Sequence, residues 1–161
     1  MTPAAAERDL VAQLLDWNEA HATFDEAVAD LAPDLRGQVP GRLPYSPWQL
    51  LEHLRRTQHD ILDFCVNPSY SALNWPEDYW PRDPVPPSDR AWQQSVAKFH
   101  ADRHALQRLA RDPAVELTAE IPHGDGQTYL HELLLAADHA AYHVGELIVV
   151  RRLLGAWPTQ R

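Results

Sequence analysis

Apolar and near-apolar residues recur at alternating intervals of four and three in the first part of the chain, which places them along one face of a helix. They are Leu10, Leu14, Trp17, His21, Phe24, Val28 and Leu31. We therefore predict a first helix over about residues 5–31, with His21 in the middle of its apolar seam. There His21 is expected to line the core or a cleft and to have a hydrogen-bond partner, rather than to bind a metal.

A second helical pattern begins in the segment "SPWQLLEHLRRTQHDILDF". Ser46 followed by Pro47 and by Gln49 three residues after the serine is a capping box with proline at the first helical position. The apolar stripe that follows consists of Leu50, Leu54, Thr57, Ile61 and Phe64. On a helical wheel His53 lies at the edge of this stripe and can face the core, whereas His59 points almost opposite and should be solvated.

A third helix is predicted after "PPSDR", with Ser88 or Asp89 as its N-cap. Its apolar stripe comprises Trp92, Val96, Phe99, Leu106 and Ala110. His100 and His104 fall roughly 80–120° away from that stripe. This pair is therefore expected on the surface, without a metal.

The fourth helix is predicted from near Thr128 to Leu154, after the turn "HGDGQ". Its outward line comprises Asp138, Gly145 and Arg152, spaced by seven residues. A different line, able to face inward, comprises Ala136, His139, His143, Glu146 and Val150.

Between the second and third helices lies "VNPSYSALNWPEDYWPRDPVPP", a segment with six prolines that excludes a helix. A connection of this length in a compact domain is usually functional or disordered, and its aromatic residues argue against disorder. It is either a strap whose rings cover the core or a wall over a site. In the second case Trp75 and Trp80 would line a substrate pocket, together with His21.

These elements predict an all-α protein, a four-helix bundle, with one domain over residues 1–161. The chain has 14 Lys and Arg against 23 Asp and Glu, a net charge of −9, which disfavours nucleic acid and anionic membranes as partners. The charged N-terminal segment and the lack of a run of ~20 apolar residues predict a cytoplasmic soluble protein. The single cysteine, Cys65, is expected to be buried.

The histidines carry the candidate chemistry. Nine histidines in 161 residues would form roughly half a pair at a spacing of four by chance, so the two observed pairs mean little without their context. Facing helices of a bundle can share an internal site, so His53 can meet His139 and His143. Three imidazoles leave coordination positions free, which is typical of a catalytic metal site, and zinc and nickel both suit imidazole.

The segments "SPWQLLEHLRRTQHDILDF", "WPEDYWP" and "ADHAAYHVGELIVVRRLLGAW" resemble the DinB-like superfamily of bacterial four-helix-bundle metalloproteins, over about residues 44–158. The resemblance implies an up-down-down-up bundle with a long crossover between helices two and three. It also implies a divalent metal bound by His53, His139 and His143. The family name refers to DNA damage, but this acidic chain gives no indication of DNA binding.

Relatives with known activities are similar to bacillithiol S-transferases and a mycothiol-dependent maleylpyruvate isomerase. The resemblance therefore implies a metal-dependent thiol S-transferase or hydrolase that acts on a small molecule, with a low-molecular-weight thiol as co-substrate. The alternatives are a non-catalytic metal-binding or stress-response protein and a metal-free bundle. Because relatives often dimerise through helix faces, a homodimer is compatible with the apolar stretch "ELIVV".

Glu146 departs from the family pattern, which usually has Gln three residues after the last histidine. A carboxylate there can orient a histidine, or act as a base toward water or thiol at the metal. The simpler interpretation is a glutamate at the end of the bundle that pairs with an arginine or with water.

Overall fold

The computed structural model describes residues 2–158 of the chain, so residues 1 and 159–161 of the predicted domain lie outside the described part. It contains five α-helices and one 3-10 turn: α1 (Pro3–Leu14), α2 (Phe24–Val28), η1 (Pro33–Leu35), α3 (Pro47–Val66), α4 (Asp89–Arg111) and α5 (Tyr129–Leu153). Within residues 2–158 there is no strand, only an isolated bridge between Glu120 and Thr128. The predicted all-α class is confirmed.

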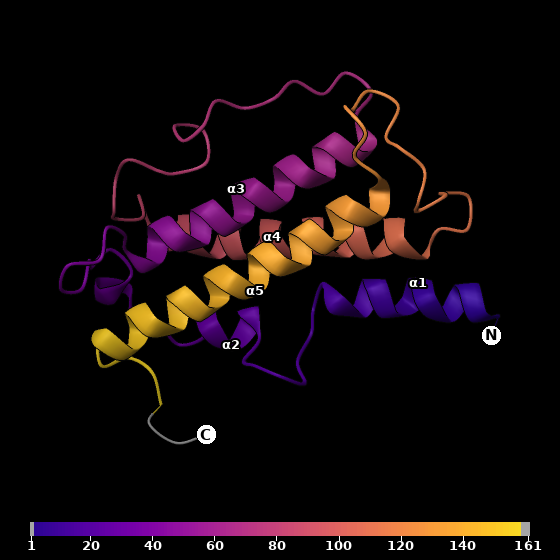
Figure 1. Ribbon diagram of the computed structural model, residues 1–161. Coiled ribbons are helices and arrows are strands. Elements are labelled where there is room, and N and C mark those ends of the chain that lie inside the picture. Colours follow the sequence, from indigo (N-terminus) through magenta and orange to yellow (C-terminus); the bar gives the residue numbers. More distant parts are fainter. Residues whose placement is uncertain (1, 159–161) are drawn as a thin grey trace.

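The four long helices lie side by side, with α3 packed against both α4 and α5, and α1 against α4 (Figure 1). Along the chain, α3 and α4 run in the same direction, and α1 and α5 run in the opposite one. Two consecutive helices that run in the same direction need a connection as long as the helix itself. The proline-rich segment 67–88 makes this connection, passing along the outside of α3.

Side-chain caps start the helices where the sequence pattern predicts. The hydroxyl oxygen of Ser46 accepts from the Gln49 backbone N–H while the Gln49 side chain accepts from the Ser46 N–H, so the capping box is present. Ser88 caps α4 and Thr128 caps α5 with a single hydrogen bond each, in which the side-chain hydroxyl accepts from a backbone N–H of the first turn.

The predicted first helix over residues 5–31 is wrong, because it is divided into α1 and α2. Thr23 and Glu26 form a capping box that starts α2. Their side chains accept from backbone N–H groups that would bond to backbone carbonyls in a continuous helix. The predicted apolar face is also not the buried one: Leu10 and Leu14 are 55% and 37% exposed, whereas Ala12 and the C-cap residue Leu15 are buried.

Two apolar clusters hold the long helices together. One joins α2, α3, α4 and α5, and at its centre the Phe24 and Phe99 rings stack with centroids 4.0 Å apart. The other lies toward the α1 end and includes Ile61, Leu106 and Leu133. Since α3 and α5 contribute to both clusters, packing positions these two helices relative to each other at both ends.

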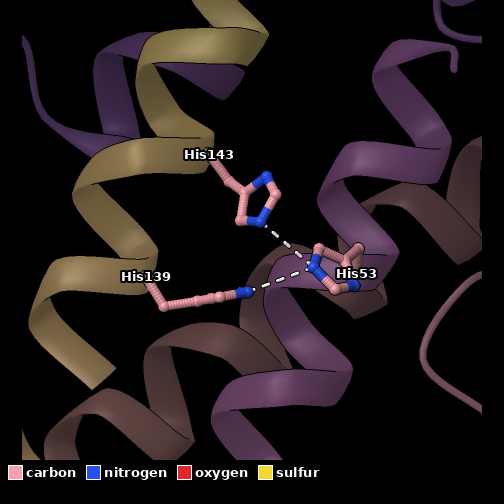
Figure 2. A group of neighbouring side chains, drawn as sticks. All are labelled: His53, His139 and His143. Atoms are coloured by element: carbon pink, nitrogen blue, oxygen red, sulfur yellow. Dashed lines mark hydrogen bonds between the residues drawn. The ribbon is translucent and has the colours of Figure 1, made fainter. Parts of the chain in front are cut away.

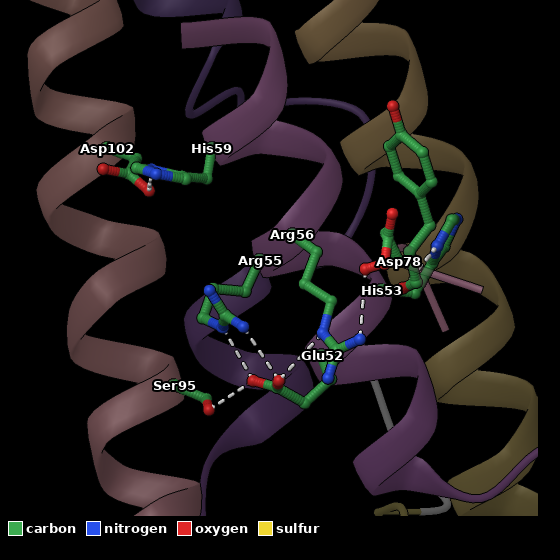
Figure 3. A network of polar contacts seen from close by, with 9 residues as sticks. Glu52, His53, Arg55, Arg56, His59, Asp78, Ser95 and Asp102 are labelled. Atoms are coloured by element: carbon green, nitrogen blue, oxygen red, sulfur yellow. Dashed lines mark hydrogen bonds and ion pairs between the residues drawn. The ribbon is translucent and has the colours of Figure 1, made fainter. Parts of the chain in front are cut away.

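A charged network lies between α3 and α4 (Figure 3). The Glu52 carboxylate, only 5% exposed, accepts hydrogen bonds from Arg55, Arg56 and Ser95. Burial alone would raise the pKa of Glu52, but the hydrogen bonds from Arg55 and Ser95 and the arginine charges outweigh it and lower that pKa to about 2. Glu52 is thus a buried carboxylate that stays charged.

Among the described residues, α5 is long and apolar enough to cross a membrane, judged by length and composition alone. Polar residues such as Asp138, His139 and Glu146 nevertheless interrupt it, so α5 holds no run of ~20 apolar residues, as the sequence predicts. In the structure 44% of the most apolar stretch of α5 is buried inside the protein, and Leu147 and Val150 belong to the core. One side of α5 thus packs into the protein core.

The isolated histidines and the cysteine largely follow their predictions. His59 is exposed and contacts Asp102, and Cys65 is buried, which raises the pKa of its thiol to about 12. His104 is exposed, but His100 is half-buried rather than on the surface. Its ring contacts Asp25 and Arg103, because α2 folds back over this part of α4.

Candidate metal centre

Three imidazoles converge between α3 and α5: His53 from α3, and His139 and His143 from successive turns of α5 (Figure 2). The Nε2 atom of His53 lies 3.1 Å from the Nε2 of His143 and 3.1 Å from the Nε2 of His139. All three candidate ligand atoms lie within 4.8 Å of one another. The structure therefore brings together the three histidines that the sequence singled out.

The spacing of these nitrogens fits a first-row metal. Zinc binds histidine nitrogen at about 2.0–2.1 Å, which puts two nitrogens of a tetrahedral site about 3.3 Å apart. The two separations of 3.1 Å from His53 are close to that value. The third separation, between the nitrogens of His139 and His143, is within 4.8 Å.

Hydrogen bonds to the outer nitrogens select the tautomers of two of the rings. His53 Nδ1 lies 3.4 Å from the Tyr79 carbonyl oxygen and His143 Nδ1 lies 2.6 Å from a Glu146 carboxylate oxygen. Both oxygens only accept, so each Nδ1 carries the proton and each Nε2 presents a lone pair to the centre. Two lone pairs 3.1 Å apart repel each other, and a cation between them removes that repulsion.

Burial keeps the three imidazoles neutral. It lowers the pKa of His53 to about 4 and that of His139 to about 3, and in both cases the neighbouring His143 lowers it further. The pKa of His143 is also lowered by burial, against an opposing effect of Glu146. Neutral imidazole is the form that binds metals, so all three rings are in the ligand form at pH 7.

Glu146 lies behind His143, on the side away from the centre. One oxygen accepts from His143 Nδ1 and the other accepts from the Tyr45 hydroxyl, both at 2.6 Å. Burial and the hydrogen bond to Glu146 raise the pKa of Tyr45 to about 12, so the phenol stays protonated and donates. This geometry favours the orienting role predicted for Glu146 over the role of base. Tyr45 was not identified from the sequence. The only sequence signal near it is that it directly precedes the N-cap residue Ser46.

We expect Glu146→Gln to keep the fold and to weaken metal binding about 10-fold, because an amide holds the His143 tautomer less firmly than a carboxylate. Competition titration with a chromogenic chelator measures the change. Tyr45→Phe, which leaves the bond between Glu146 and His143 in place, should have the smaller effect. Unchanged affinity in Glu146→Gln would rule out the orienting role.

The aromatic residues of the crossover cover His53. The Trp80 ring stacks on the His53 ring, with centroids 3.9 Å apart and planes at 8°. Trp75 is 68% exposed, and its ring meets His53 edge-on at 6.3 Å. The crossover thus combines the two predicted roles, since Trp80 packs as a strap and Trp75 forms part of a wall.

A cavity of about 610 Å³ opens beside His139, between α3, α5, the crossover and the loop before α5. Its walls include Phe64, Tyr70, Trp75 and Tyr79. A small molecule in this cavity would lie against His139, the one histidine of the three that lines it. Of the three residues predicted to line a substrate pocket, Trp75 lines this cavity, whereas Trp80 and His21 do not.

His21 lies elsewhere. It is exposed, its Nδ1 is 2.9 Å from the Ala22 carbonyl oxygen, and it lines a separate cavity of about 390 Å³ that includes Asp138 and Val144 and none of the three central histidines. The expected grouping of His21 with Trp75 and Trp80 in one pocket is therefore not what the structure shows. The end of α1 at Leu14 takes His21 out of the predicted helical seam and into a linker.

No protein-family model matches this chain, and no curated protein or solved structure is significantly similar to it. The resemblance to the DinB-like superfamily therefore rests on the quoted motifs alone.

Proposed function

We propose that this chain is a DinB-like four-helix bundle with up-down-down-up topology. The support is the direction of its helices: α1 and α5 run one way, α3 and α4 the other, and a long crossover joins α3 to α4 (Figure 1). Helix α2 is then a short insertion between the first and second helices of the bundle.

The proposed function is that of a cytoplasmic metal-dependent enzyme, with zinc or nickel held by His53, His139 and His143. One observation carries this proposal: three neutral imidazoles converge beside a cavity, and no fourth His, Cys, Asp or Glu of residues 2–158 joins their group. Three protein ligands and an adjacent cavity are typical of catalytic sites, whereas structural sites usually have four.

The proposed reaction is the transfer of a small-molecule thiol to an electrophile, or the hydrolysis of a small molecule. A bound divalent cation would favour the ionised form of a thiol or water in the cavity. The thiol would come from solution, because Cys65 is buried and its raised pKa keeps it protonated. The chain itself orients His143 through Glu146, orients His53 through Tyr79 and excludes water from one face of His53 with Trp80.

A screen of the metal-loaded protein tests this function. Low-molecular-weight thiols are paired with electrophiles, hydrolysable esters and amides are assayed alongside, and His139→Ala is the control. Turnover that requires both the metal and His139 is the expected result. Stoichiometric metal binding without turnover in any pair would instead support a non-catalytic metal-binding protein.

A further inference from the structure

Two carboxylates lie at matching positions along the helices that carry the histidines. Asp60 follows His53 by seven residues on α3, and Glu132 precedes His139 by seven residues on α5. Seven residues are nearly two helical turns, which returns each carboxylate to the same face as its histidine, about 10 Å along the helix. Because α3 and α5 run in opposite directions, both displacements point the same way (Figure 1).

The cavity beside His139 extends from the level of the histidines to the level of the two carboxylates. Asp60, Glu132 and His139 all line it, together with Asp125 of the preceding loop, and its lining residues include no lysine or arginine. Glu132 is only 5% exposed. Between the two levels the hydroxyl of Thr57 is buried and has no hydrogen-bond partner among the described residues, so a polar atom is left unsatisfied beside the cavity.

Aromatic rings line the same cavity next to these carboxylates and form an aromatic wall. The hydroxyls of Tyr70 and Tyr79 both donate to Asp60, at 3.0 and 2.6 Å, which attaches the crossover to α3 and fixes both rings. Phe64 and Trp75 complete the wall, with the Phe64 and Tyr70 rings edge to face at 5.1 Å. The carboxylate charges and the faces of the aromatic rings both attract a cation.

We propose that the substrate of this site is an organic cation, a small molecule with an ammonium or quaternary ammonium group. Its charged end lies between Asp60, Glu132 and the aromatic wall. Its reacting end lies about 10 Å away, beside His139. The assignment of this molecule as substrate rests on the proposed metal-dependent function, whereas the preference of the cavity for a cation does not. An anionic molecule is disfavoured there, since the lining has three carboxylates, those of Asp60, Asp125 and Glu132, and no lysine or arginine.

Choline and 3,3-dimethylbutan-1-ol test this preference, because they have the same shape and differ in one charge, and the quaternary ammonium group does not coordinate a metal. Binding is followed by tryptophan fluorescence and by ¹H–¹⁵N NMR shifts, on the metal-free and the zinc-loaded protein. Choline should bind at least about 10-fold more tightly than the alcohol in both forms. Equal affinities, or tighter binding of the alcohol, would overturn the proposal.

Two variants locate the charge that is responsible. Glu132→Gln and Asp60→Asn should each reduce the preference for choline several-fold while zinc content stays unchanged, and Asp34→Asn, which removes an exposed carboxylate outside the cavity, should not alter it. A preference that persists in both cavity variants would place the cation elsewhere and refute the proposal. The assay needs no turnover, so an inactive zinc-loaded protein would overturn the proposed function and leave this result standing.

Discussion

Replacing His53 or His143 with alanine is expected to weaken metal binding by more than about 100-fold, since changes to outer partners of a ligand alone reach 10–100-fold. Each substitution removes one of three protein ligands: His53→Ala leaves two ligands on α5 alone, and His143→Ala leaves one ligand on each helix. At pH 7 protons compete little for the site, because burial lowers the pKa of His53 to about 4. Metal content after dialysis and calorimetric titration with zinc or nickel measure the loss.

The matched controls are histidines on the same helices that lie outside the group. His59→Ala on α3 and His131→Ala on α5 remove exposed imidazoles and should keep full metal content. Added metal should raise the melting temperature of the wild type and of both controls, but not of His53→Ala or His143→Ala, because a ligand stabilises only the state that binds it. Full metal content in both of the latter variants would refute the assignment.

Replacing Glu52 with glutamine is expected to lower the free energy of unfolding at pH 7 by about 2–3 kcal/mol. The glutamine side chain has nearly the same shape and can still accept from Ser95, but Arg55 and Arg56 lose the negative charge that they surround (Figure 3). Urea unfolding followed by circular dichroism measures the change. Glu77→Gln, at an exposed position of the crossover, is the control and should unfold like the wild type.

The same carboxylate predicts a dependence on pH. Its pKa is about 2 in the folded protein against an ordinary value of 4.5, so the unfolded chain takes up its proton first as the solution is acidified. The stabilisation by Glu52 is therefore complete above pH 4.5 and is lost as the pH falls toward 2. The difference in stability between the wild type and Glu52→Gln should shrink over that range. A difference that stays constant down to pH 2.5 would show that the charge of Glu52 is not its cause.

Local sequence signals located most of the helices. The capping box at Ser46 and the caps at Ser88 and Thr128 act within one turn of the chain, so their hydrogen bonds form wherever the helix lies. The capping box of Thr23 and Glu26 is also local and was readable. It was missed because apolar residues continue at helical spacing through the break between α1 and α2. Periodicity alone does not show that the chain leaves one helix and starts another.

The candidate centre was predictable in part for the same reason. A spacing of four residues places His139 and His143 on one helical face without any tertiary information. That Glu146 reaches His143 follows likewise from a spacing of three residues. The contribution of His53 needed more than spacing, since the wheel placed it only at the edge of its stripe, and its role was inferred from resemblance.

Tertiary packing decided what surrounds these residues. The hydroxyl of Tyr45 reaches Glu146 across 101 positions of the chain, and Trp80 covers His53 only because the crossover follows α3. Asp60 and Glu132 lie at the same distance along the bundle from the histidines only because α3 and α5 run in opposite directions. The sequence of one helix does not determine the direction of the other. The sequence by itself determined the helices, their caps and which histidines share a face, because these depend on neighbours within a turn or two. The partners of those histidines, the cavity beside them and its charge were decided by contacts between distant segments, which exist only after the helices have packed.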